Sequence, residues 1–221
     1  MRLGVIRAHG LQADFVSDDF ESELGKLLRK RASGLSPEDE EIRQSARDML
    51  RNGRYKPTGR GKPASEYLLR AGRDPASFPR INWPVDVCNY ISLLSLLPVS
   101  IWDLQKSTGS RFVFRLGREG EQYVFNSAGQ VISVADLVVG CEVHAEASHG
   151  RPIVNPVKDS METKTTEDTQ SVAASVYAPA DYSVSRLDEI CALFADLLQM
   201  SRSGSAVAVH RLVGPGEEIS C

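Results

Sequence analysis

The chain has few cysteines and no long apolar run, and each absence excludes a class of protein. Its four cysteines, Cys88, Cys141, Cys191 and Cys221, lie far apart and form no C-x-x-C pair. This spacing argues against a disulfide framework or a four-cysteine zinc site. No segment approaches the ~20 apolar residues that cross a bilayer, and the N-terminus lacks a signal-peptide pattern. We expect a soluble, cytoplasmic protein without a metal or cofactor.

The chain also lacks an overall positive charge. Its 221 residues carry a formal net charge of −3, and 42% of them are hydrophobic. A chain of this length and composition can bury a substantial core in one domain. A nucleic-acid partner would therefore have to bind a local basic patch. One such patch lies between residues 51 and 73, with the cations Arg51, Arg54, Lys56, Arg60, Lys62, Arg70 and Arg73 against the single acid Glu66.

Part of this basic segment has the glycines of a phosphate-binding loop. Gly59 and Gly61 precede Lys62, but the Walker spacing is absent and Pro63 stands where Ser or Thr is required. The sequence therefore excludes a nucleoside-triphosphate site here. Two interpretations stay open: a flexible loop that grips a nucleic-acid backbone without sequence choice, or a solvated cationic loop.

Periodicity and turn signals predict an α+β fold. The expected strands lie at residues 2–7, within 111–117, 122–126, 130–144 and 171–178, and at 205–213. The expected helices lie at 17–34, 36–53 and 188–200, with a short helix ending near Gly72. We expect residues 1–53 to form an N-terminal strand and helical elaboration on a core domain of residues 54–221.

The longest apolar run, residues 80–104, predicts a buried helix followed by a strand. Asn82 is a candidate cap, Pro84 fits the first helical turn, and Pro98 ends the helix. Polar residues interrupt this run at regular intervals: Asp86, Asn89, Ser92 and Ser95 recur at every third position, and Ser100 and Asp103 follow. Such a polar seam faces either other parts of the protein or a ligand.

Residues 155–170 show no periodic apolar pattern and predict a long loop. A loop of this length in a compact domain is often functional or disordered. Asp159 and Glu162 are among its carboxylates, which suit an ammonium or hydroxyl group. The alternative is a mobile surface loop.

Metal binding and covalent catalysis are weakly supported. Cys141, His144 and His149 have the spacing of half a zinc site, but no matching second pair exists. Cys88 and Ser100 have no histidine at a recognisable motif spacing. The sequence therefore favours neither a metal centre nor a nucleophilic side chain.

Six segments, in order, carry a resemblance to a known module. They are YKPTGRGKPASEYLLR, INWPVDVCNYISLLSLLP, IWDL, REGE, ADLVVG and KDSMETKTTEDT, and they extend from Arg54 to about Tyr177. Together they resemble the tRNA-editing module of the phenylalanyl-tRNA synthetase beta subunit, its combined third and fourth domains, and more closely the free-standing proteins that carry this module alone. The resemblance implies a single domain with two sheets and a helical layer, a three-layer ββα sandwich.

The resemblance also implies a pocket. One wall falls on Cys88, where synthetases often have threonine, and on Asn89. A glycine-containing strand end falls on Gly140 and Cys141. The carboxylate that recognises the hydroxyl of a mischarged tyrosine falls on Glu162.

The chain departs from the family pattern at Ser100, where bacterial synthetases commonly have histidine. An aminoacyl ester is already activated, so a site can hydrolyse it by orienting the ester and a water. We expect Glu162, Asn89 and Gly140 to carry catalysis and Cys88, Ser100, Cys141 and Asp159 to contact the substrate.

The resulting prediction is a tRNA-binding protein that hydrolyses mischarged aminoacyl-tRNA in trans, with the aminoacylated 3′ end of tRNA as its partner. The predicted RNA-binding residues are Arg54, Lys56, Arg60, Lys62, Arg70 and Arg73. Two alternatives stay open: a non-catalytic RNA-binding module or synthetase partner, and a hydrolase of a small amino-acid ester or amide.

Overall fold

The computed structural model describes residues 1–109, 111–144, 150–201 and 207–216. Within these residues the helices are α1 (Asp18–Ala32), α2 (Pro37–Asp48), α3 (Ala64–Ala71), α4 (Trp83–Ser95) and α5 (Val184–Gln199). The strands are β1 (Arg2–His9), β2 (Val99–Asp103), β3 (Arg111–Leu116), β4 (Gln122–Val124), β5 (Val131–Ser133), β6 (Val138–Val143), β7 (Arg151–Val154), β8 (Ser171–Ala178) and β9 (Val207–Val213).

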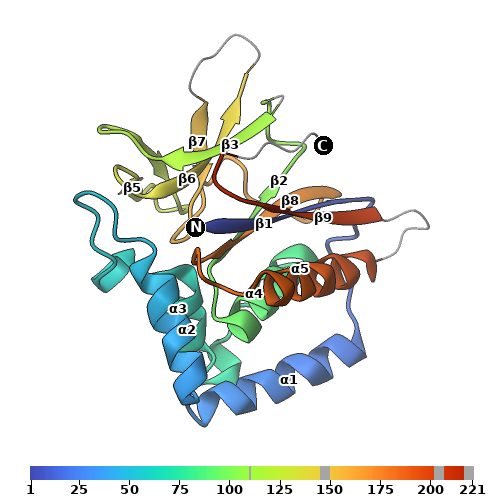
Figure 1. The fold of residues 1–221 in the computed structure, drawn as a ribbon. Helices are drawn as coiled ribbons and strands as arrows, with labels where there is room; N and C mark the ends of the chain where they lie inside the picture. Colours follow the sequence, from blue (N-terminus) through green and yellow to red (C-terminus); the bar gives the residue numbers. More distant parts are fainter. Residues whose placement is uncertain (110, 145–149, 202–206, 217–221) are drawn as a thin grey trace.

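A four-stranded antiparallel sheet in the order β2-β8-β1-β9 forms the middle layer. Helices α4 and α5 cover one face of this sheet, and the three-stranded sheet β3-β6-β7 lies over the other face (Figure 1). Strands β4 and β5 form a separate hairpin. The predicted α+β fold with two sheets and a helical layer is confirmed.

Side-chain alternation along β8 explains the two cores. Val172, Ala174 and Val176 pack with the helices, whereas Ala173 and Tyr177 face the smaller sheet. The helix-side core is the larger of the two and contains Ile6, Val87, Ile91, Leu187, Cys191 and Phe194. Strands β2 and β8 of the middle sheet are therefore buried on both faces, whereas β9 at the other edge exposes Val207 and Val209.

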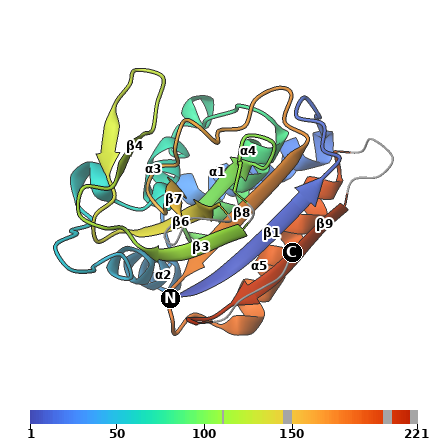
Figure 2. The ribbon, with the colours of Figure 1, turned by 90° about the horizontal axis from the view of Figure 1, so that it is seen from above.

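The predicted N-terminal strand lies inside the middle sheet. β1 pairs with β8 on one side and with β9 on the other (Figure 2). Residues 1–53 thus share the core with the rest of the chain through this strand. The boundary after residue 53 stays a prediction.

Local side-chain caps set most helix starts where the sequence predicts them. Ser17, Ser36 and Asn82 accept hydrogen bonds from the backbone N–H groups of Phe20, Asp39 and Val85, respectively. Pro84 lies in the first turn of α4, as expected.

Four boundaries differ from the prediction. α2 ends at Asp48, five residues before the predicted end at Gly53. α5 begins at Val184 rather than at residue 188, because Ser183 caps it. α4 ends at Ser95, before Pro98, because Leu96 adopts a left-handed conformation with φ 61°. Residues 130–144 form two strands, β5 and β6, separated by a turn in which Asp136 has a φ of 61°.

Strand β7 was missed entirely. It is four residues long, follows Gly150 and contains Pro152, so it shows no alternating pattern. Among the described residues, no helix is long and apolar enough to cross a membrane.

Candidate functional site

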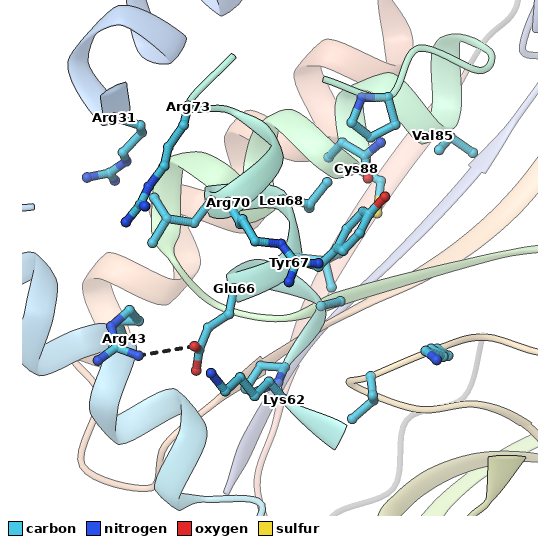
Figure 3. A pocket seen from close by; sticks show the side chains of 18 of the residues that line it. Arg31, Arg43, Lys62, Glu66, Tyr67, Leu68, Arg70, Arg73, Val85 and Cys88 are labelled. Atoms are coloured by element: carbon cyan, nitrogen blue, oxygen red, sulfur yellow. Dashed lines mark ion pairs between the residues drawn. The ribbon is translucent and has the colours of Figure 1, made fainter. Parts of the chain in front are cut away.

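An open pocket of about 1830 Å³ is bounded by α3, the outward side of α4, β2 and the loop at residues 155–165. Figure 3 shows part of its lining, with Lys62, Tyr67, Arg70 and Arg73 on one side and Val85 and Cys88 on another. Segments that lie far apart in the sequence therefore meet at this pocket.

Helix α4 and strand β2 supply an apolar floor with one free amide. Val85, Cys88 and Asn89 follow helical spacing and line the pocket together, next to Val99 and Ile101 of β2. The Asn89 side chain has no hydrogen-bond partner among the described residues. Burial raises the pKa of the Cys88 thiol well above its ordinary value, with a smaller contribution from Asp159. The floor therefore presents an amide rather than a reactive thiol.

The loop at residues 155–159 is held rigidly by Asn155. The Asn155 Oδ1 atom accepts hydrogen bonds from the N–H groups of Val157 at 2.7 Å and Lys158 at 2.8 Å. Its Nδ2 atom donates to the Tyr123 hydroxyl, which in turn donates to the Lys158 carbonyl. These contacts place Asp159 at the pocket.

Asp159 is the carboxylate that reaches this pocket from the loop. It accepts hydrogen bonds from the N–H groups of Asn155 at 3.2 Å and Ile101 at 3.4 Å. Burial raises its pKa to about 7, although contact with the Ser100 hydroxyl and these two N–H groups opposes the shift. Asp159 therefore changes charge near neutral pH.

Ser100 lies behind the pocket wall. Its hydroxyl donates to the Asn155 carbonyl at 3.0 Å and accepts from the Tyr177 hydroxyl at 3.2 Å, and the side chain is fully buried. The residue that departs from the family pattern thus supports Asp159 and Asn155 and does not line the pocket.

The other predicted catalytic and substrate-binding residues, Gly140, Cys141 and Glu162, do not line this pocket. Gly140 and Cys141 lie in the interior of β6, where burial raises the pKa of Cys141 to about 11. The Glu162 side chain is 59% exposed and pairs with Arg151 on β7. The proposed roles of Gly140, Cys141 and Glu162 stay predictions. His144 is exposed, and both His149 and Cys221 lie outside the described residues.

Four of the predicted RNA-binding cations line the pocket, namely Arg60, Lys62, Arg70 and Arg73. Within the described part of the chain, none of them forms an ion pair. Arg54 and Lys56 lie outside the pocket lining, and the Arg54 guanidinium contacts Glu119 at 3.3 Å. Four cations of the basic segment that lack an acidic partner therefore gather at the pocket.

Two contributors were missed from the sequence. The Lys158 Nζ atom lies 3.9 Å from the centroid of the Phe125 ring, and both residues line the pocket. Burial and the neighbouring Arg60 guanidinium lower the pKa of Lys158. No motif marks Phe125, since it lies just after the short strand β4. Lys158 lies in the segment 155–170, in which the carboxylates outnumber the lysines, so the sequence drew attention to the acids.

A comparison with domain families decides the family. Residues 59–194 match the B3/4 domain. The chain belongs to the B3/4 domain family. The predicted likeness to the corresponding module of the phenylalanyl-tRNA synthetase beta subunit is thereby confirmed. The matched region of this B3/4 domain contains α3, α4, β2 and the 155–165 loop, and so includes most of the pocket.

Two further comparisons add little information about the family. A search of curated proteins gives no match. Among solved structures, this B3/4 domain is similar to an N-terminal fragment of the phenylalanyl-tRNA synthetase beta subunit from Pyrococcus horikoshii, with a TM-score of 0.45 and 10% identity. The similarity covers 97% of this chain and 50% of that one, so the chain spans about half the length of that protein.

Proposed function

We propose that this B3/4 domain binds the aminoacylated 3′ end of a tRNA and hydrolyses the ester of a mischarged amino acid. The observation that carries the proposal is the pocket itself. A free amide and a carboxylate, Asn89 and Asp159, lie in a pocket whose walls carry Arg60, Lys62 and other unpaired cations. An aminoacylated RNA end presents the complementary groups, namely an ammonium, an ester and several phosphates.

The charge distribution supports the RNA part of the proposal. Eight Lys and Arg residues line the pocket against three acids, and two of these acids, Glu40 and Glu66, pair with Arg43. Burial lowers the pKa of Lys158, and repulsion from the Arg60 guanidinium lowers it further. A bound phosphate would relieve this repulsion and would supply much of the affinity.

The residues on the floor of the pocket support the hydrolytic part of the proposal. In its charged form Asp159 binds the amino acid's ammonium group, and the Asn89 amide orients the ester carbonyl or a water molecule. Water adds to the carbonyl carbon, the ester C–O bond breaks, and the ribose hydroxyl of the tRNA leaves with a proton. No covalent enzyme intermediate is required, which agrees with the buried Cys88 thiol.

The position of Glu162 favours a second candidate, a non-catalytic RNA-binding module. The resemblance assigns the discriminating carboxylate to Glu162, yet this side chain pairs with Arg151 and does not line the pocket. Such a module would bind tRNA without turnover. A hydrolase of small amino-acid esters, the third candidate, would show turnover without tRNA affinity.

Deacylation of a panel of mischarged tRNAs tests the proposal. The wild-type protein, Asn89→Ala, Asp159→Asn and Glu162→Ala would each be added to tRNAs that carry a radiolabelled non-cognate amino acid. We expect release above the buffer rate with wild type and at least a tenfold loss with Asn89→Ala. Release at the buffer rate for every tRNA would exclude hydrolysis, and retained tRNA binding would then identify the non-catalytic module.

A further inference from the structure

An exposed tyrosine lies among the free cations of the pocket. Tyr67 is 57% exposed, and it is one of two large apolar side chains in the described residues, with Ile81, that are exposed and also line the pocket. The exposed part of the ring contributes no hydrophobic stabilisation to the folded state, because it stays in water. Tyr67 therefore presents an open aromatic ring to the pocket.

The side chains of helix α3 point in three directions. Leu68 packs into the core, and Glu66 pairs with Arg43 of α2. Tyr67 points away from Glu66, toward the open side of the pocket (Figure 3). Because Tyr67 and Arg70 are three residues apart on the helix, they share one face.

The Tyr67 ring already makes a cation–π contact with Arg70. The Arg70 Cζ atom lies 5.5 Å from the ring centroid, an arrangement that holds the ring in place and leaves much of it open to solvent. Lys62 and Arg73, which line the same pocket, have no ion pair among the described residues. An aromatic ring beside free cations is the combination that binds unpaired nucleotides, with stacking on the base and charge on the phosphates.

We propose that Tyr67 and Arg70 form a stacking platform for an unpaired base of the RNA end that enters the pocket. The inference rests on the proposed RNA-binding function and adds the subsite that selects a single-stranded end. The cations alone would bind any phosphate backbone. Tyr67 adds a preference for RNA whose bases are not paired, because a base inside a duplex has no free face.

A fluorescent RNA end tests the platform. The probe is an RNA hairpin with an unpaired 3′ overhang that carries 2-aminopurine as its terminal base, and the control RNA is the same hairpin with a blunt end. We expect the wild-type protein and Tyr67→Phe to quench the 2-aminopurine. Tyr67→Leu is expected to lose the quench and to weaken binding of the overhang RNA roughly tenfold, while binding of the blunt hairpin stays unchanged.

Several outcomes would overturn the platform. Equal quenching by wild type and Tyr67→Leu, or an equal loss of affinity for both hairpins, would do so while leaving RNA binding by the protein intact. Failure of the wild-type protein to bind either hairpin or intact tRNA would instead remove the proposed function as well. Urea unfolding of Tyr67→Leu would verify that its fold is retained.

Discussion

Glu66 of α3 pairs with Arg47 of α2, whose Nε atom lies 2.5 Å from the Glu66 Oε1 atom. Arg43 of α2 contacts the same carboxylate at 3.1 Å. Glu66 is the only acid between residues 51 and 73, and it neutralises cations of α2. Among the described residues, Arg60, Lys62, Arg70 and Arg73 of the basic segment are thereby left without an acidic partner.

This pairing predicts a stability loss for Glu66→Ala. The substitution leaves the largely buried Arg47 guanidinium without its acid and leaves Arg43 with Glu40 alone, so we expect the free energy of unfolding to fall by about 2 kcal/mol. Urea denaturation measures it. Glu23→Ala is the matched control, because its pair with Lys26 is more than half exposed and should contribute under ~0.5 kcal/mol. Equal losses in the two variants would contradict the prediction.

Removing pocket cations should flatten the salt dependence of tRNA binding. If Arg60 and Lys62 each contact a phosphate, Arg60→Ala/Lys62→Ala should reduce the slope of log affinity against log salt by about 1.5. The control, Lys26→Ala/Lys30→Ala, removes the same charge from α1 at positions outside the pocket lining. An unchanged slope in the pocket variant would exclude both residues from phosphate contact.

The pKa of Asp159 predicts a pH dependence of stability. Burial raises this pKa to about 7, above the ~4 of an unfolded aspartate. Between these values the folded state binds more protons than the unfolded state. Stability therefore falls as pH rises from 5 toward 7, by at most about 1.4 kcal/mol per pH unit, and levels off above. Asp159→Asn should remove this component of the slope in urea titrations at pH 5 to 8, and parallel curves for both proteins would refute it.

Gly140 has a packing role that mutation can expose. A Cβ atom there would lie 2.6 Å from Val154 Cγ2 and 2.8 Å from Phe114 Cε1, in the buried smaller sheet. We expect Gly140→Ala to lose about 1–3 kcal/mol of stability. Gly25→Ala provides the control, because its Cβ meets only the end of the Arg29 side chain and alanine favours a helix. Comparing kcat of Gly140→Ala with its fraction folded separates this packing role from the predicted catalytic one.

Buried thiols should resist alkylation. Cys88, Cys141 and Cys191 are buried, and burial raises the pKa of each. In a Cys221→Ser background at pH 8, iodoacetamide should modify none of them in the folded protein and all three in 6 M urea, as mass spectrometry would detect. Rapid modification of folded Cys88 would contradict its assignment as an unreactive part of the floor.

Local signals in the sequence predicted the elements well. The caps at Ser17, Ser36 and Asn82 and the regular spacing of the polar residues in α4, such as Asp86 and Asn89, act over one or two turns, so sequence alone reveals them. The left-handed Leu96 had no such signal, because glycine is the residue normally expected there. Strand pairing depends on distant partners, which leaves a strand as short as β7 without a visible pattern.

The sequence predicted only some of the residues that line the pocket, because the rest depend on tertiary contacts. Asn89 and Asp159 lie on its walls, but the direction of each loop side chain depends on partners from other strands. Asn155 and Tyr123 fix residues 155–159, and Arg151 pairs with Glu162. Tyr123 lies 32 residues before Asn155, and Arg151 belongs to β7, a strand without a visible sequence pattern. The lack of apolar periodicity therefore predicted the loop, but it could not indicate which of the loop's carboxylates reaches the pocket.

The position of β1 has a consequence for biosynthesis. Both of its partners, β8 and β9, lie more than 160 residues later in the chain. Strand β1 therefore cannot pair until more than 160 further residues have been synthesised, and its apolar residues, such as Leu3 and Ile6, stay uncovered meanwhile. Such long-range pairing slows folding and prolongs the exposure of apolar surface, so we expect the yield of native protein to respond to chaperone supply.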